Sequence, residues 1–281
     1  FDLSGFLGAD GWVSPAVLEE IRRNGYSWTS WSFFWGIDSP YLLWIAHLLC
    51  LGVFASFMLG WKSRVTSVLA YVLAVAYAGR ASSALFGLDK INIMLAMYVM
   101  LGPSGAKYSL DHWLAQRKAG RALPPPEPST TANFAIRLIQ IHLAIVYLFS
   151  GISKLLGQSW WNGTAVWEAV ANYEYQSLDM TWLAGWPMLV AAMSITTVAW
   201  ELFYPVLIWN RLTRPIMLAM AVLVHGGIAL CMGMITFGLI MIVANLSFIS
   251  PETVRAFVDP ILSRLTRSGP INSNSSRSQS E

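Results

Sequence analysis

Charged residues are scarce in this sequence. Asp, Glu, Lys and Arg make up 12% of the 281 residues, whereas 56% are hydrophobic. Soluble domains carry roughly a quarter of their residues as these four charged types. The low charge leaves too little polar surface to face water on every side, so the composition excludes an ordinary soluble domain. The 14 Trp and 10 Tyr also favour a membrane protein, because amphipathic rings concentrate among lipid headgroups.

Several other classes of protein and site are excluded because the sequence lacks the residues or motifs that they require. The net charge is only +3 and no long basic run is present, so no nucleic-acid partner is expected. Cys50 and Cys231 both fall in apolar runs, which implies no disulfide framework. No zinc-protease, nucleophile-elbow or phosphate-loop motif occurs and the four histidines are spread out, so we predict no metal site. The chain opens at Phe1 without a methionine, and we expect it to be a processed product or part of a longer chain.

Seven apolar runs predict an all-α fold, a polytopic helical membrane protein with about seven membrane segments. A spanning helix needs about 20 apolar residues, and four or five of the runs reach that length. One run has 12 residues, about 18 Å of helix at about 1.5 Å per residue, so it must be tilted, re-entrant or extended by the polar stretch before it. The runs are 41–60, 65–86, 91–102 (the short one), 134–156, 187–209, 215–233 and 235–250.

The runs divide the chain into three parts. Residues 1–40 combine turn signals, a short helical pattern around Val17–Arg23 and an aromatic cluster from Trp28 to Trp35, which is typical of an interfacial segment. Residues 41–250 form the predicted transmembrane domain. Residues 251–281 form a tail that we predict to be largely disordered, since it is rich in Ser and Asn after Leu265.

The distribution of Lys and Arg predicts the orientation. Segments 61–64, 103–133, 210–214 and the tail carry basic residues, whereas loop 157–186 carries none. Because cytoplasmic loops are enriched in Lys and Arg, we expect residues 1–40 and loop 157–186 outside and the C-terminus in the cytoplasm. The expected location is a bacterial cytoplasmic membrane, with membrane lipids as partners.

Ionisable residues within the runs are candidates for function, because charge is costly at membrane depth. Counting at about 1.5 Å per residue places His225 near mid-membrane and Glu201 in the inner third. The same count places Arg80 in the outer third and Lys154 at the outer boundary.

Each of these residues also has a structural interpretation. Lys154 would extend to the outer headgroups, and Arg80 would pair with Asp89 across a tight hairpin. His142 and His225, the histidines in the later apolar runs, would hydrogen-bond a backbone carbonyl or Asn245. Glu201 has no basic residue near it in the sequence, so it needs a partner on another helix or a proton.

Three different blocks of polar residues lie within or beside the apolar runs. The first is Gly87-Leu-Asp-Lys-Ile-Asn92, the second runs from Gln140-Ile-His142 through Lys154 to Trp160-Trp-Asn-Gly163, and the third runs from Glu201 through His225 to Asn245. In this order and spacing they resemble the vitamin K-dependent gamma-carboxylase-like family, also called the horizontally transferred transmembrane (HTTM) domain. The resemblance covers most of 41–250.

The resemblance implies a cofactor and two catalytic residues. In the carboxylases, a lysine in the second block is implicated as the base that deprotonates vitamin K hydroquinone. The oxygenated quinone then removes a proton from a substrate glutamate, and the carbanion takes up carbon dioxide. Lys154 falls on that lysine and His225 matches a family histidine, so a quinone or reduced naphthoquinone is the implied cofactor. A lysine amine that is partly stripped of water can act as a base near neutral pH.

The chain also departs from the carboxylases. They carry a histidine a few residues after their Asp-Lys pair, where this chain has Ala96. They also carry a large soluble domain that grips the substrate, which we do not expect here. The resemblance therefore implies the family scaffold rather than peptide carboxylation, and leaves open whether the protein is an enzyme.

We expect an outward-facing pocket between the helices that binds a quinone-like or lipid-like molecule. Loop 157–186 would form its lid. The predicted lining residues are Lys154, Arg80, Asp89 and Lys90 near the mouth, His225 and Glu201 deeper, and Trp160 and Trp161 in the lid.

The alternative is a non-catalytic accessory subunit or assembly factor of a larger membrane protein complex. Ala96 and the aromatic N-terminal segment, which could pack on a partner, favour this alternative. Other membrane protein subunits would then be the expected partners.

Overall fold

A computed structural model describes residues 2–8, 11–12, 14–23, 31–121, 123–124 and 126–267. Within these residues every regular element is a helix, which confirms the all-α prediction. The α-helices are α1 (Leu3–Leu7), α2 (Pro15–Arg23), α3 (Pro40–Met58), α4 (Ser63–Arg80), α5 (Gly87–Leu101), α6 (Leu110–Ala119), α7 (Thr130–Leu155), α8 (Gln158–Asn162), α9 (Ala165–Val170), α10 (Pro187–Leu207), α11 (Arg214–Cys231), α12 (Ile235–Asn245) and α13 (Pro251–Arg267). Short 3-10 turns are η1 (Phe33–Gly36), η2 (Ser82–Ala84), η3 (Thr181–Gly185) and η4 (Leu246–Phe248).

Fewer helices than predicted are suited to cross a bilayer. In the described part of the chain, four helices are long and apolar enough to cross a membrane: α3, α7, α10 and α11. The bent pair of α12–η4 and α13 would be a fifth if it formed one span. Helix α5 has only 15 residues, about 22 Å, against a hydrocarbon core about 30 Å thick. Helix α4 has 18 residues but includes Arg64 and Arg80. The structure therefore supports a multi-pass membrane protein with four or five such helices, and it does not confirm the seven predicted membrane segments.

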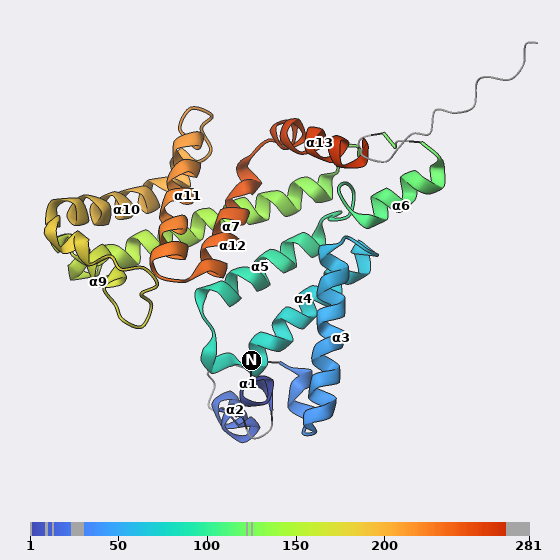
Figure 1. The fold of residues 1–281 in the computed structure, drawn as a ribbon, viewed down its shortest axis with the longest axis horizontal. Coiled ribbons are helices and arrows are strands. Elements are labelled where there is room, and N and C mark those ends of the chain that lie inside the picture. Colours follow the sequence, from blue (N-terminus) through green and yellow to red (C-terminus); the bar gives the residue numbers. More distant parts are fainter. Residues whose placement is uncertain are drawn as a thin grey trace, which may run out of the picture.

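The helices form two groups, and α5 connects them because it contacts α4 in the first and α7 and α12 in the second. Figure 1 shows α3 and α4 near the N-terminus at one side and α10 at the opposite end, with α5 and α7 between them. One apolar core packs α1 and η1 against α3, with α4 alongside. The larger core joins α5, α7, α10, α11 and α12 around the aromatic residues Tyr147, Trp200 and Tyr204. The ring centroids of Tyr147 and Tyr204 are 4.2 Å apart, so this core holds α7 firmly against α10.

Arg80 connects the N-terminal segment to α4. Its side chain is only 1% exposed, and its guanidinium donates hydrogen bonds to the carbonyls of Leu7, at 3.0 Å, and Gly8. Asp89 instead accepts a hydrogen bond from the Phe86 backbone N–H at 2.9 Å and so caps α5. The predicted ion pair between Arg80 and Asp89 is therefore replaced by two separate structural contacts.

The start of α4 is capped by a residue distant in the sequence. Lys62 adopts a left-handed conformation, with φ of 47°, and its side chain makes no capping hydrogen bond. Asp111 on α6 accepts hydrogen bonds from the backbone N–H groups of Lys62 and Ser63, both at 2.7 Å, and from the Ser63 hydroxyl at 2.7 Å. These N–H groups have no partner within α4, so α6 supplies the cap that the α3–α4 turn lacks.

The N-terminal segment agrees with the prediction where it is described, whereas the C-terminal tail differs in part. The expected helical pattern at Val17–Arg23 is present as α2, whereas Trp28 lies outside the described residues. The first part of the predicted disordered tail is helical and forms α13. Residues 268–281 lie outside the described residues.

We predict that Asp111→Ala destabilises the protein by about 1 kcal/mol, the usual cost of losing a helix cap. Hydrogen bonds from the Ser63 backbone and hydroxyl, and from Lys62, hold the pKa of Asp111 below its ordinary value. The carboxylate therefore contributes stability above about pH 4 and loses this contribution as pH falls through the folded pKa. Thermal unfolding in one detergent should show a gap between wild type and variant at pH 7 that narrows at lower pH.

The control is Asp38→Ala, which removes an exposed aspartate that makes no hydrogen bond within the described residues. This variant should unfold like wild type at every pH. A gap for Asp111→Ala that stays constant from pH 7 to below pH 4 would contradict the capping role.

Candidate functional site

A cavity of about 600 Å³ lies among α7, α9, α10, α11 and α12. Figure 1 shows α10 and α11 diverging from their short connection, and residues of both helices line the cavity. Its volume is in the range of small-molecule sites. Its wall is mostly aliphatic and methionine side chains, and its polar groups come from Tyr147, Ser150, Lys154, Trp160, Thr196, Thr197, Glu201 and His225.

The cavity has exposed lining residues on both α10 and α11. Met193 on α10 and Leu223 on α11 both line the cavity, and they are 39% and 65% exposed. Both residues belong to helices that are suited to cross a membrane. These two exposed lining residues are apolar, whereas Thr196 on α10, which is also exposed and lines the cavity, is polar.

Lys154 and Glu201 form an ion pair inside this cavity. Lys154 Nζ lies 3.0 Å from Glu201 Oε1 and 2.8 Å from Oε2, and it also donates a hydrogen bond to Ser150 Oγ at 2.7 Å. The two side chains are 21% and 8% exposed. Lys154 also lies 5.2 Å from the centroid of the Trp160 ring. Lys154 is thus the partner on another helix that Glu201 required.

The contact corrects the membrane depths counted from the sequence, which set Lys154 at the outer boundary and Glu201 in the inner third. Helices α8 and α9 pack along the first half of α10, where the Val166 backbone N–H donates to Ser194 Oγ at 3.1 Å. Helix α10 therefore begins beyond the end of α7, which brings Glu201 level with Lys154. Gly151 permits the approach, because a Cβ there would lie 3.0 Å from the Leu202 side chain.

A series of hydrogen bonds from Tyr204 through Asn245 and Tyr147 holds the His225 ring in place. Tyr204 Oη donates to Asn245 Oδ1 at 2.6 Å, and Asn245 Nδ2 donates to Tyr147 Oη at 2.9 Å and to the Met241 carbonyl at 2.8 Å. Tyr147 Oη lies 2.8 Å from His225 Nε2. Because Asn245 uses its N–H groups on these two acceptors, the hydroxyl proton of Tyr147 is left for His225 Nε2.

This arrangement determines which ring nitrogen of His225 carries hydrogen. With Nε2 accepting from Tyr147, the neutral imidazole has its proton on Nδ1. His225 Nδ1 is buried and has no hydrogen-bond partner within the described residues. His225 therefore brings one unsatisfied N–H donor to the cavity that it lines.

The cavity also contains one unsatisfied acceptor. Glu201 Oε2 is buried and, although it lies 2.8 Å from Lys154 Nζ, it accepts no well-aligned hydrogen bond. Lys154 donates to Ser150 and Glu201 Oε1, so one of its three N–H groups is not used by them. The site thus has donors and an acceptor close together in apolar surroundings.

Of the other predicted site residues, the structure places all but Trp160 outside this cavity. Trp160 lines it, whereas Trp161 is 68% exposed and donates its indole N–H to the Leu155 carbonyl at 2.6 Å. Arg80 is buried against the N-terminal segment, and Lys90 is exposed.

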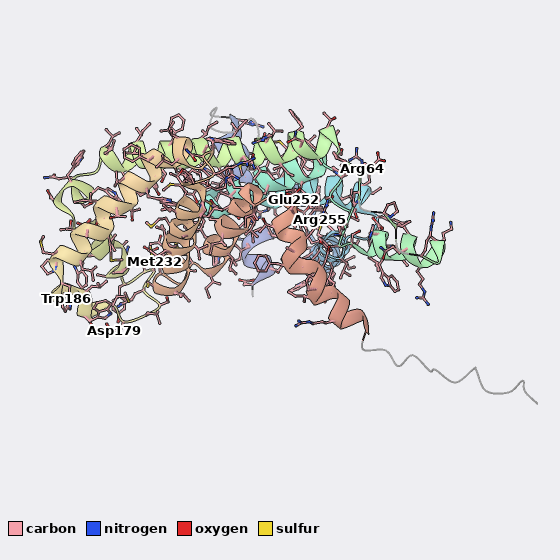
Figure 2. All side chains as sticks on the ribbon, turned by 90° about the horizontal axis from the view of Figure 1, so that it is seen from above. Arg64, Asp179, Trp186, Met232, Glu252 and Arg255 are labelled. Atoms are coloured by element: carbon pink, nitrogen blue, oxygen red, sulfur yellow. The ribbon has the colours of Figure 1, made fainter. Side chains whose placement is uncertain are left out.

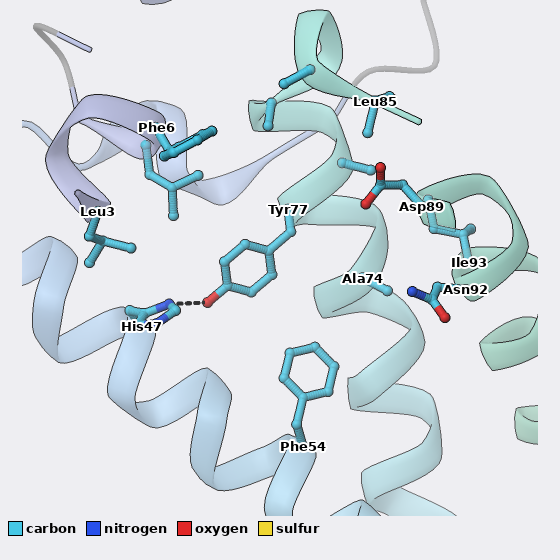
Figure 3. Close-up of a pocket in the computed structure, with 14 residues that line it drawn as sticks. Leu3, Phe6, His47, Phe54, Ala74, Tyr77, Leu85, Asp89, Asn92 and Ile93 are labelled. Atoms are coloured by element: carbon cyan, nitrogen blue, oxygen red, sulfur yellow. Dashed lines mark hydrogen bonds between the residues drawn. The ribbon is translucent and has the colours of Figure 1, made fainter. Parts of the chain in front are cut away.

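Asp89 lines a second cavity of about 360 Å³ among α1, α3, α4 and α5. Figure 3 shows Tyr77 reaching His47, with 2.7 Å between Tyr77 Oη and His47 Nδ1, and Asp89 and Asn92 on the α5 side.

Sequence reasoning did not identify Tyr147 and Tyr204 as members of the site. Tyr147 precedes Lys154 by seven residues and Tyr204 follows Glu201 by three, so each shares a helix face with a predicted residue. That spacing was the available signal.

Comparison with known proteins identifies relatives of this chain. A family model described as HTTM domain matches residues 20–252. The chain is 23% identical over 227 residues to the "Uncharacterized protein YitO" of Bacillus subtilis (strain 168), a match that covers 77% of this chain and 70% of that protein. No solved structure matches the chain.

We predict that the single substitutions Lys154→Met and Glu201→Leu each destabilise the protein by about 3 kcal/mol, because each leaves a charge in the cavity without its partner. The double variant should lose less stability than either single variant. Thermal unfolding of all four proteins in one detergent measures this coupling.

The matched control is the more exposed pair of Lys107 and Asp259, whose charged atoms are 3.0 Å apart. Its variants, Lys107→Met and Asp259→Leu, should change stability little. Losses that simply add in the Lys154→Met, Glu201→Leu double variant would show that the two charges are not coupled.

Proposed function

The chain belongs to the HTTM domain family, and we propose that it binds a quinone-like molecule in the cavity among α7, α10 and α11. The expected ligand is a flat or elongated apolar molecule that carries carbonyl or phenol oxygen atoms. The observation that supports this most directly is the buried, unsatisfied N–H of His225 beside the Lys154–Glu201 pair.

An unsatisfied buried donor costs about 1–3 kcal/mol, so it favours a ligand that accepts its hydrogen bond. A carbonyl or phenol oxygen suits His225 Nδ1–H and the remaining N–H of Lys154. The aliphatic and methionine side chains of the wall suit an apolar ring or tail. The exposed apolar lining residues Met193 and Leu223 suit entry from lipid.

Proton transfer would be shared by Lys154 and Glu201 rather than carried by Lys154 alone. Paired with a carboxylate, Lys154 is an ammonium that donates hydrogen bonds, so it is not a free base. Glu201 Oε2 is the atom that can accept a proton from a ligand hydroxyl. A bound quinone would supply two-electron redox chemistry, which side chains cannot supply themselves.

The distribution of basic residues supports a proposed orientation. Loop 157–186, which contains α8 and α9, has no Lys or Arg and is placed outside, with the C-terminus in the cytoplasm of a bacterial cell. The cavity would then lie toward the outer half of the membrane, under α9.

The test is binding of a short-chain naphthoquinone to the purified chain in nanodiscs. Lys154→Ala and His225→Phe should each weaken binding about tenfold or more, because each removes a hydrogen bond worth about 1.5 kcal/mol. Lys154→Arg should retain part of the affinity, because it keeps the charge. Quenching of tryptophan fluorescence during a titration reports the affinity, since Trp160 lines the cavity.

Lys90→Ala is the matched control, because Lys90 is an exposed lysine outside the cavity. Binding that is unchanged in Lys154→Ala, Lys154→Arg and His225→Phe would overturn the site assignment. Purification of a stable complex with another membrane protein, without any bound quinone, would favour the accessory-subunit alternative.

A further inference from the structure

Helix α13, the last element that the structure describes, exposes an apolar face. Three residues at helical spacing form a stripe along it, with exposed fractions of 37%, 72% and 59%: Val254, Phe257 and Ile261. Positions separated by three, four and seven residues lie on one side of a helix. The family model ends at residue 252, so this helix belongs to the part of the chain beyond that match.

A polar contact on the other side of α13 holds this stripe away from the protein. Asp259 accepts hydrogen bonds from Lys107 Nζ, at 3.0 Å, and from Tyr108 Oη, at 2.6 Å, both in the connection between α5 and α6. At about 100° per residue, Asp259 is turned about 160° from both Phe257 and Ile261. The stripe therefore faces outward while its opposite side is attached to the α5–α6 connection.

The chain geometry places α13 at the end of the membrane helices. The segment α12–η4 and α13 are bent by 116° relative to each other, with only Ile249 and Ser250 between η4 and α13. In Figure 2, α13 begins near Glu252 and Arg255 and runs away from the other helices toward the end of the described chain. Three Cα-to-Cα steps of about 3.8 Å separate Phe248 from Pro251, so α13 starts within about 11 Å of the end of the α12–η4 segment.

The charges of α13 fit the edge of a bilayer. At about 100° per residue, Arg264 lies about 20° from Phe257 at one edge of the apolar stripe, whereas Arg255 is turned about 100° from Val254 toward the side of Asp259. Arginine side chains beside an apolar face can reach phosphate groups while their stems remain among acyl chains. This combination of an apolar face with flanking basic residues is typical of helices that lie in the plane of a membrane surface.

We propose that α13 is an interfacial helix that lies on the lipid of the same membrane, with Val254, Phe257 and Ile261 among the acyl chains. Arg255 and Arg264 contact the phosphates of anionic headgroups. The contact of Asp259 with Lys107 and Tyr108 sets the rotation of the helix, so that the apolar stripe faces the lipid.

The test uses nitroxide labels on single cysteines in the full chain, after replacement of Cys50 and Cys231 by Ala. The labelled variants are Phe257→Cys and Ile261→Cys in the stripe, and Ala256→Cys on the other side as the matched control. The protein is reconstituted in phosphatidylcholine vesicles with and without phosphatidylglycerol. Accessibility to oxygen, which concentrates in the bilayer, is compared with accessibility to a water-soluble nickel chelate.

Labels at 257 and 261 should show an oxygen-to-nickel ratio several-fold higher than the label at 256. Phosphatidylglycerol should raise the ratio further, and Arg255→Gln with Arg264→Gln should abolish that additional rise. Equal ratios at 256, 257 and 261 would overturn the interfacial position. Low accessibility to both reagents at 257 and 261 would show that this chain or a second copy covers the stripe, and it would overturn the lipid contact. A ratio that is insensitive to phosphatidylglycerol would overturn the headgroup contact.

Discussion

An ammonium and a carboxylate within an apolar bundle are costly to separate, and this constraint joins the two long helices that form the cavity wall. Lys154 near the end of α7 and Glu201 in the second half of α10 can meet only if α10 begins well beyond α7. Helices α8 and α9 occupy the space created by that offset. The ion pair, the offset and the short helices of loop 157–186 are therefore parts of one arrangement.

The cost of leaving polar groups unpaired in lipid also explains the hydrogen bonds among Tyr204, Asn245, Tyr147 and His225. In lipid, buried polar groups must find partners within the protein. Tyr204, Asn245, Tyr147 and His225 satisfy one another in series across α10, α12, α7 and α11. The series ends at His225 Nδ1, and the ion pair ends at Glu201 Oε2. His225 Nδ1 and Glu201 Oε2 thus belong to residues that line one cavity, where a ligand can complete their hydrogen bonds.

Local sequence patterns predicted the helices well, because apolar runs and turn residues act over short distances. They also predicted that Glu201 needs a distant partner. They did not identify Lys154 as that partner, because counting residues from the nearest loop assumes that all helices begin at one height. Arg80 and Asp89 are close in the sequence, yet each bonds backbone groups instead. Helix α13 was missed because its apolar residues are spaced along one face and form no continuous run.

Entry from lipid, as proposed, would give the cavity a side entrance between transmembrane helices, because exposed lining residues lie on both α10 and α11. A molecule that uses this entrance exchanges with the surrounding lipid and does not need to dissolve in water. Occupancy would then depend on the mole fraction of that molecule in the bilayer, and its arrival rate on lateral diffusion in two dimensions. A compound with negligible aqueous solubility could therefore saturate the protein at a modest abundance within the membrane.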